Sequence, residues 1–278
     1  MSVSVHTNTS AMIALQNLNK TNDQLDEVQN RINTGLKVTG AKDNASVWAI
    51  AQGQRADVSA LGAVKMSLDR ATSISDVSLA AGETISDLLN QLKEKVVSAM
   101  DPSLDAASRT LLNNDYTSLL AQITKVADNA IFDGANILNG SLAADIQFLA
   151  DADATSFVTL GLQDMSLGGA IITMAATSTI GTVTDATAVL AQLDASITNV
   201  NAALGALGAQ AKQIENHNKF VAKLNDVLEA GIGNLVDADL AKESARLQAL
   251  QVQQQLGAQA LSIANSSPQV ILSLFRNG

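Results

Sequence analysis

The last helical stretch of the chain, residues 236–276, reads VDADLAKESARLQALQVQQQLGAQALSIANSSPQVILSLFR. One heptad position of this stretch carries apolar side chains: Leu240, Leu247 and Leu261. A companion position carries three more: Val236, Leu250 and Ala264. Polar or small residues interrupt both positions: Glu243, Gln254 and Gly257. A seam of this kind predicts a helix that is marginal alone and needs a partner along its apolar stripe.

A matching seam near the N-terminus predicts that partner. A helix is expected over about residues 5–34, where apolar residues recur every seven positions: Leu18, Leu25 and Ile32. Leu15 and Val28 lie beside this stripe, and polar residues interrupt it: Thr21, Asn22 and Gln29. The two ends of the chain therefore carry matching, imperfect seams, which predicts that the terminal helices pair.

The region between the seams is also mostly helical. Helical spacing runs without proline from about 44 to 100, where Asp101-Pro102 ends it, and returns over about 104–130 and 185–232, ending at Gly231-Ile-Gly233. Residues 145–149 and 156–160 read as a β-hairpin. The predicted fold class is mainly α: a long antiparallel helical rod, coiled-coil-like, with paired terminal helices and a small central β-hairpin region.

Composition excludes several classes of protein. The 278 residues contain no cysteine, which removes disulfides and thiolate chemistry. A net charge of −10 argues against nucleic-acid binding, because neutralising phosphates requires clustered Lys and Arg. No run reaches about 18 consecutive apolar residues, so we expect no membrane insertion. The N-terminus has no basic region followed by an apolar stretch, which predicts that no cleavable secretory signal is present.

Catalytic and metal-binding patterns are weak. His6 and His217 have no second ligand at helical spacing, and no HExxH pattern occurs. The Asp-Ala-Asp sequences at 151–153 and 237–239 lack the Gly and Glu positions of a calcium loop. Asp237 fits a helix N-cap or a first-turn acid better. We therefore predict no enzyme activity, no catalytic residue, no cofactor and no metal.

Motifs at both ends resemble those of bacterial flagellins. The N-terminal set is Asn8-Thr9, Gly35-Leu36-Lys37, Ala41-Lys42-Asp43-Asn44-Ala45, Ala49-Ile50-Ala51 and Phe132-Asp133-Gly134 with Ile137-Leu138. The C-terminal set is Asp237-Ala-Asp239, Ala241, Glu243, Gln254-Gln255, Gly257, Leu261, Ala264-Asn265, Pro268-Gln269 and the segment from Ile271 to Arg276. Paired motifs in this order are more specific than any one of them, and the chain is similar to the short flagellins of alphaproteobacteria.

The resemblance implies a structural subunit that self-assembles into the flagellar filament for swimming motility. It implies that residues 1–40 and 237–278 form the inner tube, that 41–140 and 185–236 form the helical rod of the outer tube, and that 141–184 form a short β/Thr-rich central segment. It also implies type III export of the unfolded chain, an extracellular location in a homo-oligomeric helical filament, and contacts with the export apparatus, the filament cap and the junction proteins.

Two groups of residues carry the expected interactions. The self-assembly residues are the seam positions Leu18, Leu25, Ile32, Leu240, Leu247, Leu250, Leu261 and Leu274. The second group concerns an innate immune receptor that grips the N-terminal rod of many flagellins. Recognised relatives have Arg at the position of Gln91 and Leu at that of Lys95, so the resemblance implies weak recognition of this chain.

Two other functions remain open at this stage. A hook–filament junction protein resembles flagellin at both ends but usually has a larger, less hairpin-like centre. A cytoplasmic helical signalling rod would show longer and cleaner heptads and would not need matched termini.

Overall fold

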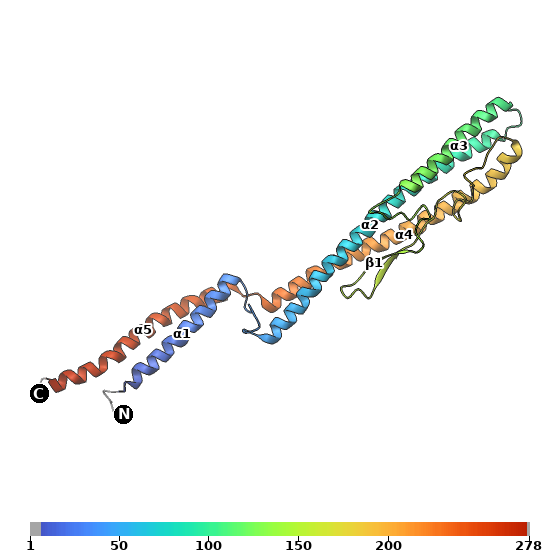
Figure 1. Ribbon diagram of the computed structural model, residues 1–278. Coiled ribbons are helices and arrows are strands. Elements are labelled where there is room, and N and C mark those ends of the chain that lie inside the picture. Colours follow the sequence, from blue (N-terminus) through green and yellow to red (C-terminus); the bar gives the residue numbers. More distant parts are fainter. Residues whose placement is uncertain (1–6, 277–278) are drawn as a thin grey trace. The chain divides into compact units, whose positions relative to one another are not determined.

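The computed structural model describes residues 7–276, with side chains over residues 7–266. The described chain is mainly α and contains one small antiparallel hairpin (Figure 1). It divides into two compact units, one made of Met1–Ala56 and Val227–Gly278 and the other of Asp57–Asp226. The predicted fold class, mainly α with paired terminal helices and a small central hairpin, is confirmed.

The first unit is built on the two terminal helices. α1 (Thr9–Thr34) and α5 (Leu240–Arg276) lie side by side and antiparallel (Figure 1). The first residues of α2 (Ala45–Ala99) and the last residues of α4 (Val183–Val236) complete this unit.

The second unit packs α3 (Ala106–Asn129) and the larger parts of α2 and α4 into a bundle (Figure 1). Ion pairs join Lys95 of α2 to Asp115 of α3 at 3.2 Å and Lys93 of α2 to Asp194 of α4 at 2.7 Å. Gly82 lets α2 and α4 approach closely, since a Cβ there would lie 2.6 Å from Leu204 Cδ2. Fully buried side chains from all three helices fill the interior: Leu68, Ile74, Leu89, Leu120, Ile123 and Leu193.

The hairpin is formed by β1 (Ile146–Leu149) and β2 (Phe157–Leu160), with Phe148 opposite Val158. Side chains on one face of it are buried, in keeping with the two-residue period of a strand: Phe148, Val158 and Leu160. The amide of Leu149 donates to Ser67 Oγ of α2 at 3.1 Å, and His217 of α4 lies 2.8 Å from the carbonyl oxygen of Ala150. The central segment is thus anchored on both long helices.

The end of α4 differs from the sequence prediction. A break was expected at Gly231-Ile-Gly233, but α4 continues through both glycines to Val236. Glycine costs a helix interior about 1 kcal/mol relative to Ala, so it weakens a helix without ending it. Ile232 and Val236 are buried, and their packing offsets that cost.

A buried arginine closes the turn between α2 and α3. The guanidinium of Arg109 donates to the carbonyl oxygens of Asp101 at 3.2 Å and Leu104 at 3.3 Å, and also to that of Ala99, the last residue of α2. The last carbonyls of a helix have no partner within the helix, and a planar cation with five N–H donors can satisfy several at once. Arg109 therefore fixes the path of the chain after Pro102.

Replacing Arg109 with Ala should lower the free energy of unfolding of the second unit by about 2–3 kcal/mol, because buried carbonyls lose charged donors. Arg109→Lys should recover only part of the lost stability, since an ammonium group lacks the planar, forked set of N–H donors of a guanidinium. Arg70→Ala is the matched control, because Arg70 makes an exposed pair with Asp133 that contributes little. Urea unfolding followed by circular dichroism measures the difference. Equal stability of the Arg109→Ala and Arg70→Ala variants would contradict this role.

Candidate self-assembly surface of the terminal helix pair

Both ends of α1 are fixed by local chemistry. Asn8 caps the N-terminus by accepting from the amide of Ala11 at 3.0 Å, and its Nδ2 donates to the carbonyl oxygen of Ala264 on α5 at 2.7 Å. Gly35 ends the helix in the left-handed conformation, with a φ of 71° that favours glycine. Gly35 of the Gly35-Leu36-Lys37 motif is therefore explained by its backbone conformation.

A backbone clasp joins the two chain segments that flank the helix pair. Leu36 and Asp237 form an isolated antiparallel bridge. The Lys37 amide donates to the carbonyl oxygen of Val236 at 2.7 Å, and the Ala238 amide donates to that of Gly35 at 2.8 Å. Asp237 thus belongs to the clasp, and the N-cap of α5 is Asp239, whose Oδ1 accepts from Ala241 and Lys242. The sequence prediction that Asp237 is the N-cap or a first-turn acid of this helix was wrong, because α5 begins at Leu240.

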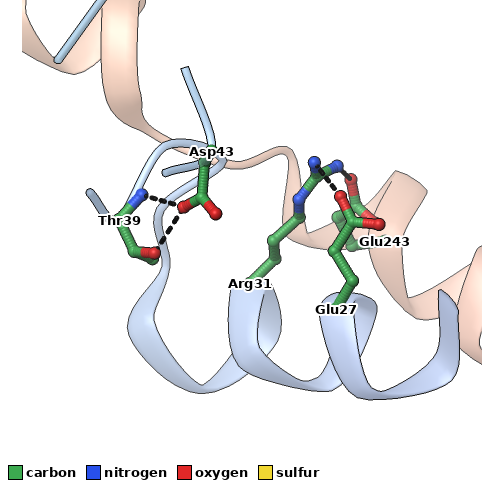
Figure 2. Close-up of polar contacts among 5 residues, drawn as sticks. All are labelled: Glu27, Arg31, Thr39, Asp43 and Glu243. Carbon is green, nitrogen blue, oxygen red and sulfur yellow. Dashed lines mark hydrogen bonds and ion pairs between the residues drawn. The ribbon is translucent and has the colours of Figure 1, made fainter. Parts of the chain in front are cut away.

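The Ala41-Lys42-Asp43-Asn44-Ala45 motif forms a tight loop between α1 and α2. Asp43 Oδ2 accepts from the amide of Thr39 at 2.9 Å and from its hydroxyl at 2.5 Å (Figure 2). These hydrogen bonds, that of the hydroxyl first, hold the pKa of Asp43 below its ordinary value. Asn44 Oδ1 then accepts from the amide of Val47 at 3.1 Å in the first turn of α2. The motif therefore ends one loop and starts one helix.

The seam between α1 and α5 has a small core. Leu25, Val28 and Leu250 are buried together, and Ile32 and Leu247 pack against them, partly buried. Five of the apolar side chains read from the two heptad patterns thus meet in one cluster. All five lie in the half of the seam nearer the clasp.

The other half of the seam is more open. Leu18 and Leu261 are only half-buried and line a groove of about 500 Å³ together with Ala258, Ser262, Asn265 and Ser266. Leu240, at the start of α5, is 50% exposed. The side chain of Leu274 lies outside the described residues.

Both helices also expose large apolar side chains away from the seam. Those on α1 are Met12, Ile13 and Leu15, and those on α5 are Val252, Leu256 and Ile263. Ile263 is 70% exposed. Exposed apolar side chains in this number on one helix pair are in keeping with a region that another protein covers.

An ion network crosses the seam near the clasp (Figure 2). Arg31 pairs with Glu27 on its own helix at 2.5 Å and with Glu243 of α5 at 3.3 Å. Glu243 is buried, and within the described part of the chain its Oε2 has no hydrogen-bond partner. The sequence patterns marked Glu243 as an interruption of a heptad position and as a residue of the C-terminal motif set, without giving it a partner. An acidic residue at a core position of the heptad pattern could have indicated that a basic residue on the other helix pairs with it.

The remaining candidate residues lie elsewhere. Gln91 is exposed on α2, and Lys95 is half-buried beside Asp115. His217 contacts the backbone near the hairpin, whereas His6 lies outside the described residues. Within residues 7–276 no group of His, Cys, Asp or Glu is placed to hold a metal ion. Across the described helices, none has the length and apolar character needed to cross a membrane.

Comparison with known proteins fits this arrangement of paired ends. The family model described as the bacterial flagellin N-terminal helical region matches residues 5–143, and that of the bacterial flagellin C-terminal helical region matches residues 190–275. Flagellin FljJ of Caulobacter vibrioides is 56% identical over 282 residues, covering 100% of both chains. The chain belongs to the bacterial flagellin family.

Other flagellins are similar over nearly the full length. Flagellin FljM of Caulobacter vibrioides is 50% identical, covering 98% of each chain, and a flagellin of Brucella melitensis is 38% identical, covering 98% of this chain and 99% of the relative. The crystal structure of Bacillus cereus flagellin aligns at 20% identity and a TM-score of 0.49, covering 56% of this chain and 88% of that chain.

The family assignment establishes what the molecule does. This flagellin is a structural subunit of the extracellular flagellar filament, which serves motility and is built of flagellin subunits. It belongs to a structural family, not to an enzyme family. The junction-protein and signalling-rod alternatives receive no support from the comparisons.

Replacing Leu247 or Leu261 with Asp should block polymerisation while leaving the second unit folded. A carboxylate without a partner in the seam costs several kcal/mol in each subunit. Leu247→Met, which keeps the volume and the apolar character, is the control and should still polymerise. Light scattering during seeded assembly measures polymerisation, and circular dichroism checks the fold. Filament growth by both Asp variants at the normal rate would contradict a role for these leucines in assembly.

Proposed function

We propose that the paired terminal helices, residues 1–40 and 237–278, line the inner tube of the filament. Residues 41–140 and 185–236 form the helical rod of the outer tube, and residues 141–184 form a short segment that faces outward. The observation that carries this proposal is the exposed apolar surface of α1 and α5, which includes Met12, Val252 and Ile263. In a closed tube, the same helices of neighbouring subunits would cover these exposed apolar side chains.

The thin seam supports assembly-dependent pairing. Leu25, Val28 and Leu250 are the buried members of the seam cluster, whereas a stable helix pair buries apolar residues along its whole length. Isolated helices of this size are marginal in water without such burial. We therefore infer that contacts with neighbouring subunits supply much of the stability of the terminal pair.

The same weakness supports passage of the chain through an export apparatus. A chain that must travel unfolded benefits from termini that do not form a stable core and from the absence of cysteine, which removes the risk of cross-linking in transit. The proposed partners are the type III flagellar export apparatus, the filament cap and the junction proteins at the base of the filament.

Amides of α1 and α5 should exchange rapidly in the isolated monomer and become protected in the filament, because pairing depends on neighbouring copies. Amides around Leu120 and Ile123 in α3 are the internal control and should be protected in both states, since both side chains are buried in the second unit. Hydrogen exchange measured by mass spectrometry on monomer and filament separates the two. Strong protection of both terminal helices before assembly would contradict assembly-dependent pairing.

We also propose that this flagellin activates the innate flagellin receptor weakly. Gln91 is exposed on α2 and offers a neutral amide where recognised relatives present the planar, charged fork of Arg. Lys95 is already paired with Asp115 at 3.2 Å. A receptor that makes an apolar contact at this position would bury the charged ammonium group of Lys95, which weakens binding. Interfaces depend on few residues, so two such changes together can remove most of the binding energy.

Reporter cells exposed to purified monomer should respond weakly. The double variant Gln91→Arg with Lys95→Leu should raise the response at least about tenfold, the gain expected from restoring one or two anchor residues. Gln122→Arg, an exposed change of the same kind on α3, is the control for an arginine added elsewhere on the rod. A full response to the unaltered protein at the concentration that suffices for enterobacterial flagellin would show the proposal wrong.

A further inference from the structure

The residues that interrupt the apolar seam of α5 meet matching residues on α1. Glu243 pairs with Arg31 at 3.3 Å, and Gln254 Nε2 donates to Asn22 Oδ1 at 2.8 Å. At Gly257, the missing side chain leaves space beside Leu18, whose Cδ1 would lie 3.3 Å from an added Cβ. Each of the three irregular positions of α5 therefore has its own complement on α1: a base for an acid, an amide for an amide, and a large side chain for a glycine.

We propose that these three contacts form a register lock, which allows α1 and α5 to pair in one alignment. Polar groups at core positions of a coiled coil are known to specify register at a cost in stability. The lock is a property of the helix pair, and it rests on the proposed function only in that pairing is completed in the filament. Arg31, Glu243, Asn22, Gln254 and Gly257 are thus positioning residues for assembly.

The leucine heptads alone would not set this alignment. Leu18, Leu25 and Ile32 are equivalent under a shift of seven residues, and so are Leu240, Leu247 and Leu261, apart from the gap at Gln254. A slip of one heptad would therefore keep most apolar side chains in contact with apolar partners. The clasp at Leu36 and Asp237 fixes the alignment only at one end of the pair. Along the helices themselves, the discrimination against slipped alignments comes from the irregular positions.

Each slip has an identifiable penalty. A shift in one direction moves Glu243 from the turn of Arg31 to the turn of Leu25, which places a buried carboxylate against an apolar core without a cation. A shift in the other direction moves Gln254 from the turn of Asn22 to the turn of Val28, a fully buried residue, and leaves its amide without a partner. Glu243 would then face the segment beyond the end of α1 and lose its ion pair with Arg31.

The geometry at Gly257 provides a direct reporter of register. A Cβ at Gly257 would lie 3.9 Å from Leu18 Cβ, inside the range of about 3.5–4.5 Å that disulfides require. The cysteine pair Leu18→Cys with Gly257→Cys should therefore cross-link in the native register. Ala11→Cys with Gly257→Cys reports the one-heptad slip that moves Glu243 to the turn of Leu25, since Ala11 lies about 10 Å along the helix from Leu18. The chain contains no other cysteine.

Each cysteine pair is introduced into three proteins that differ in the seam. The native seam keeps both residues, the apolar seam carries Arg31→Leu with Glu243→Leu, and the charge exchange carries Arg31→Glu with Glu243→Arg. Filaments are grown from each protein and oxidised, and intramolecular cross-links are identified by peptide mass spectrometry. Asp26→Leu with Arg246→Leu removes one exposed acid and one exposed base from the same two helices and is the matched control.

The lock predicts that the native seam cross-links through position 18 and scarcely through position 11. The apolar seam should raise the position 11 cross-link about tenfold, a size in keeping with coupling between neighbouring residues, and the charge exchange should return it to the native value. The control variant should behave as the native seam does.

Other outcomes would overturn the inference in distinguishable ways. An unchanged position 11 cross-link in the apolar seam would refute the lock and leave the paired terminal helices intact. Absence of the position 18 cross-link from native filaments would refute the pairing itself, and the proposed inner tube with it. If the apolar seam does not assemble, the charge exchange decides: its assembly supports the lock, and its failure overturns it.

Discussion

The structure depends on one weak contact, the antiparallel pairing of α1 with α5. Its buried cluster comprises Leu25, Val28 and Leu250, with two further apolar side chains packed against it. Full burial of one apolar side chain contributes about 1.5–3 kcal/mol to stability. A core of this size offsets only part of the conformational entropy that is lost when the two helices become ordered. The clasp at Leu36 and Asp237 holds the two chain segments together where α1 ends and α5 begins, which shortens the loop that pairing must close.

The second unit is built differently, and the contrast explains why the two units can behave differently. Its buried side chains come from three helices and the hairpin, and two of its buried polar side chains, those of Tyr116 and Arg109, are hydrogen-bonded within the unit. Burial raises the pKa of Tyr116, whose hydroxyl lies 2.7 Å from Ser178 Oγ, and the guanidinium of Arg109 serves several carbonyls. A unit of this kind has its own core and does not need a partner to fold. The chain thus combines one unit with a large core of its own and one with a small core, and the proposed function assigns completion of the second to neighbouring copies.

The sequence was sufficient to predict the elements and insufficient to predict the contacts that fix them. Heptad spacing predicted both terminal helices and identified Leu25 and Leu250, because a repeat of seven places residues on one face whatever their partner is. Two local signals misled: Gly231 and Gly233 did not end α4, and Asp239 took the capping role assigned to Asp237. The ion pair of Arg31 with Glu243 and the buried position of Arg109 could not be predicted, since both depend on which turns of separate helices meet.

Weak pairing and unique pairing make opposite demands on a seam, and the irregular positions reconcile them. A seam of uninterrupted leucines would be stable before assembly and would tolerate a slip of one heptad at little cost. Replacing some of those leucines with an acid, an amide and a glycine removes apolar area, which weakens the isolated pair. Because each replacement is matched on α1 by Arg31, Asn22 or Leu18, the native alignment loses less than the slipped ones do. The energy gap between alignments therefore widens as the total stability falls, which suits a helix pair that must form late and form in one way.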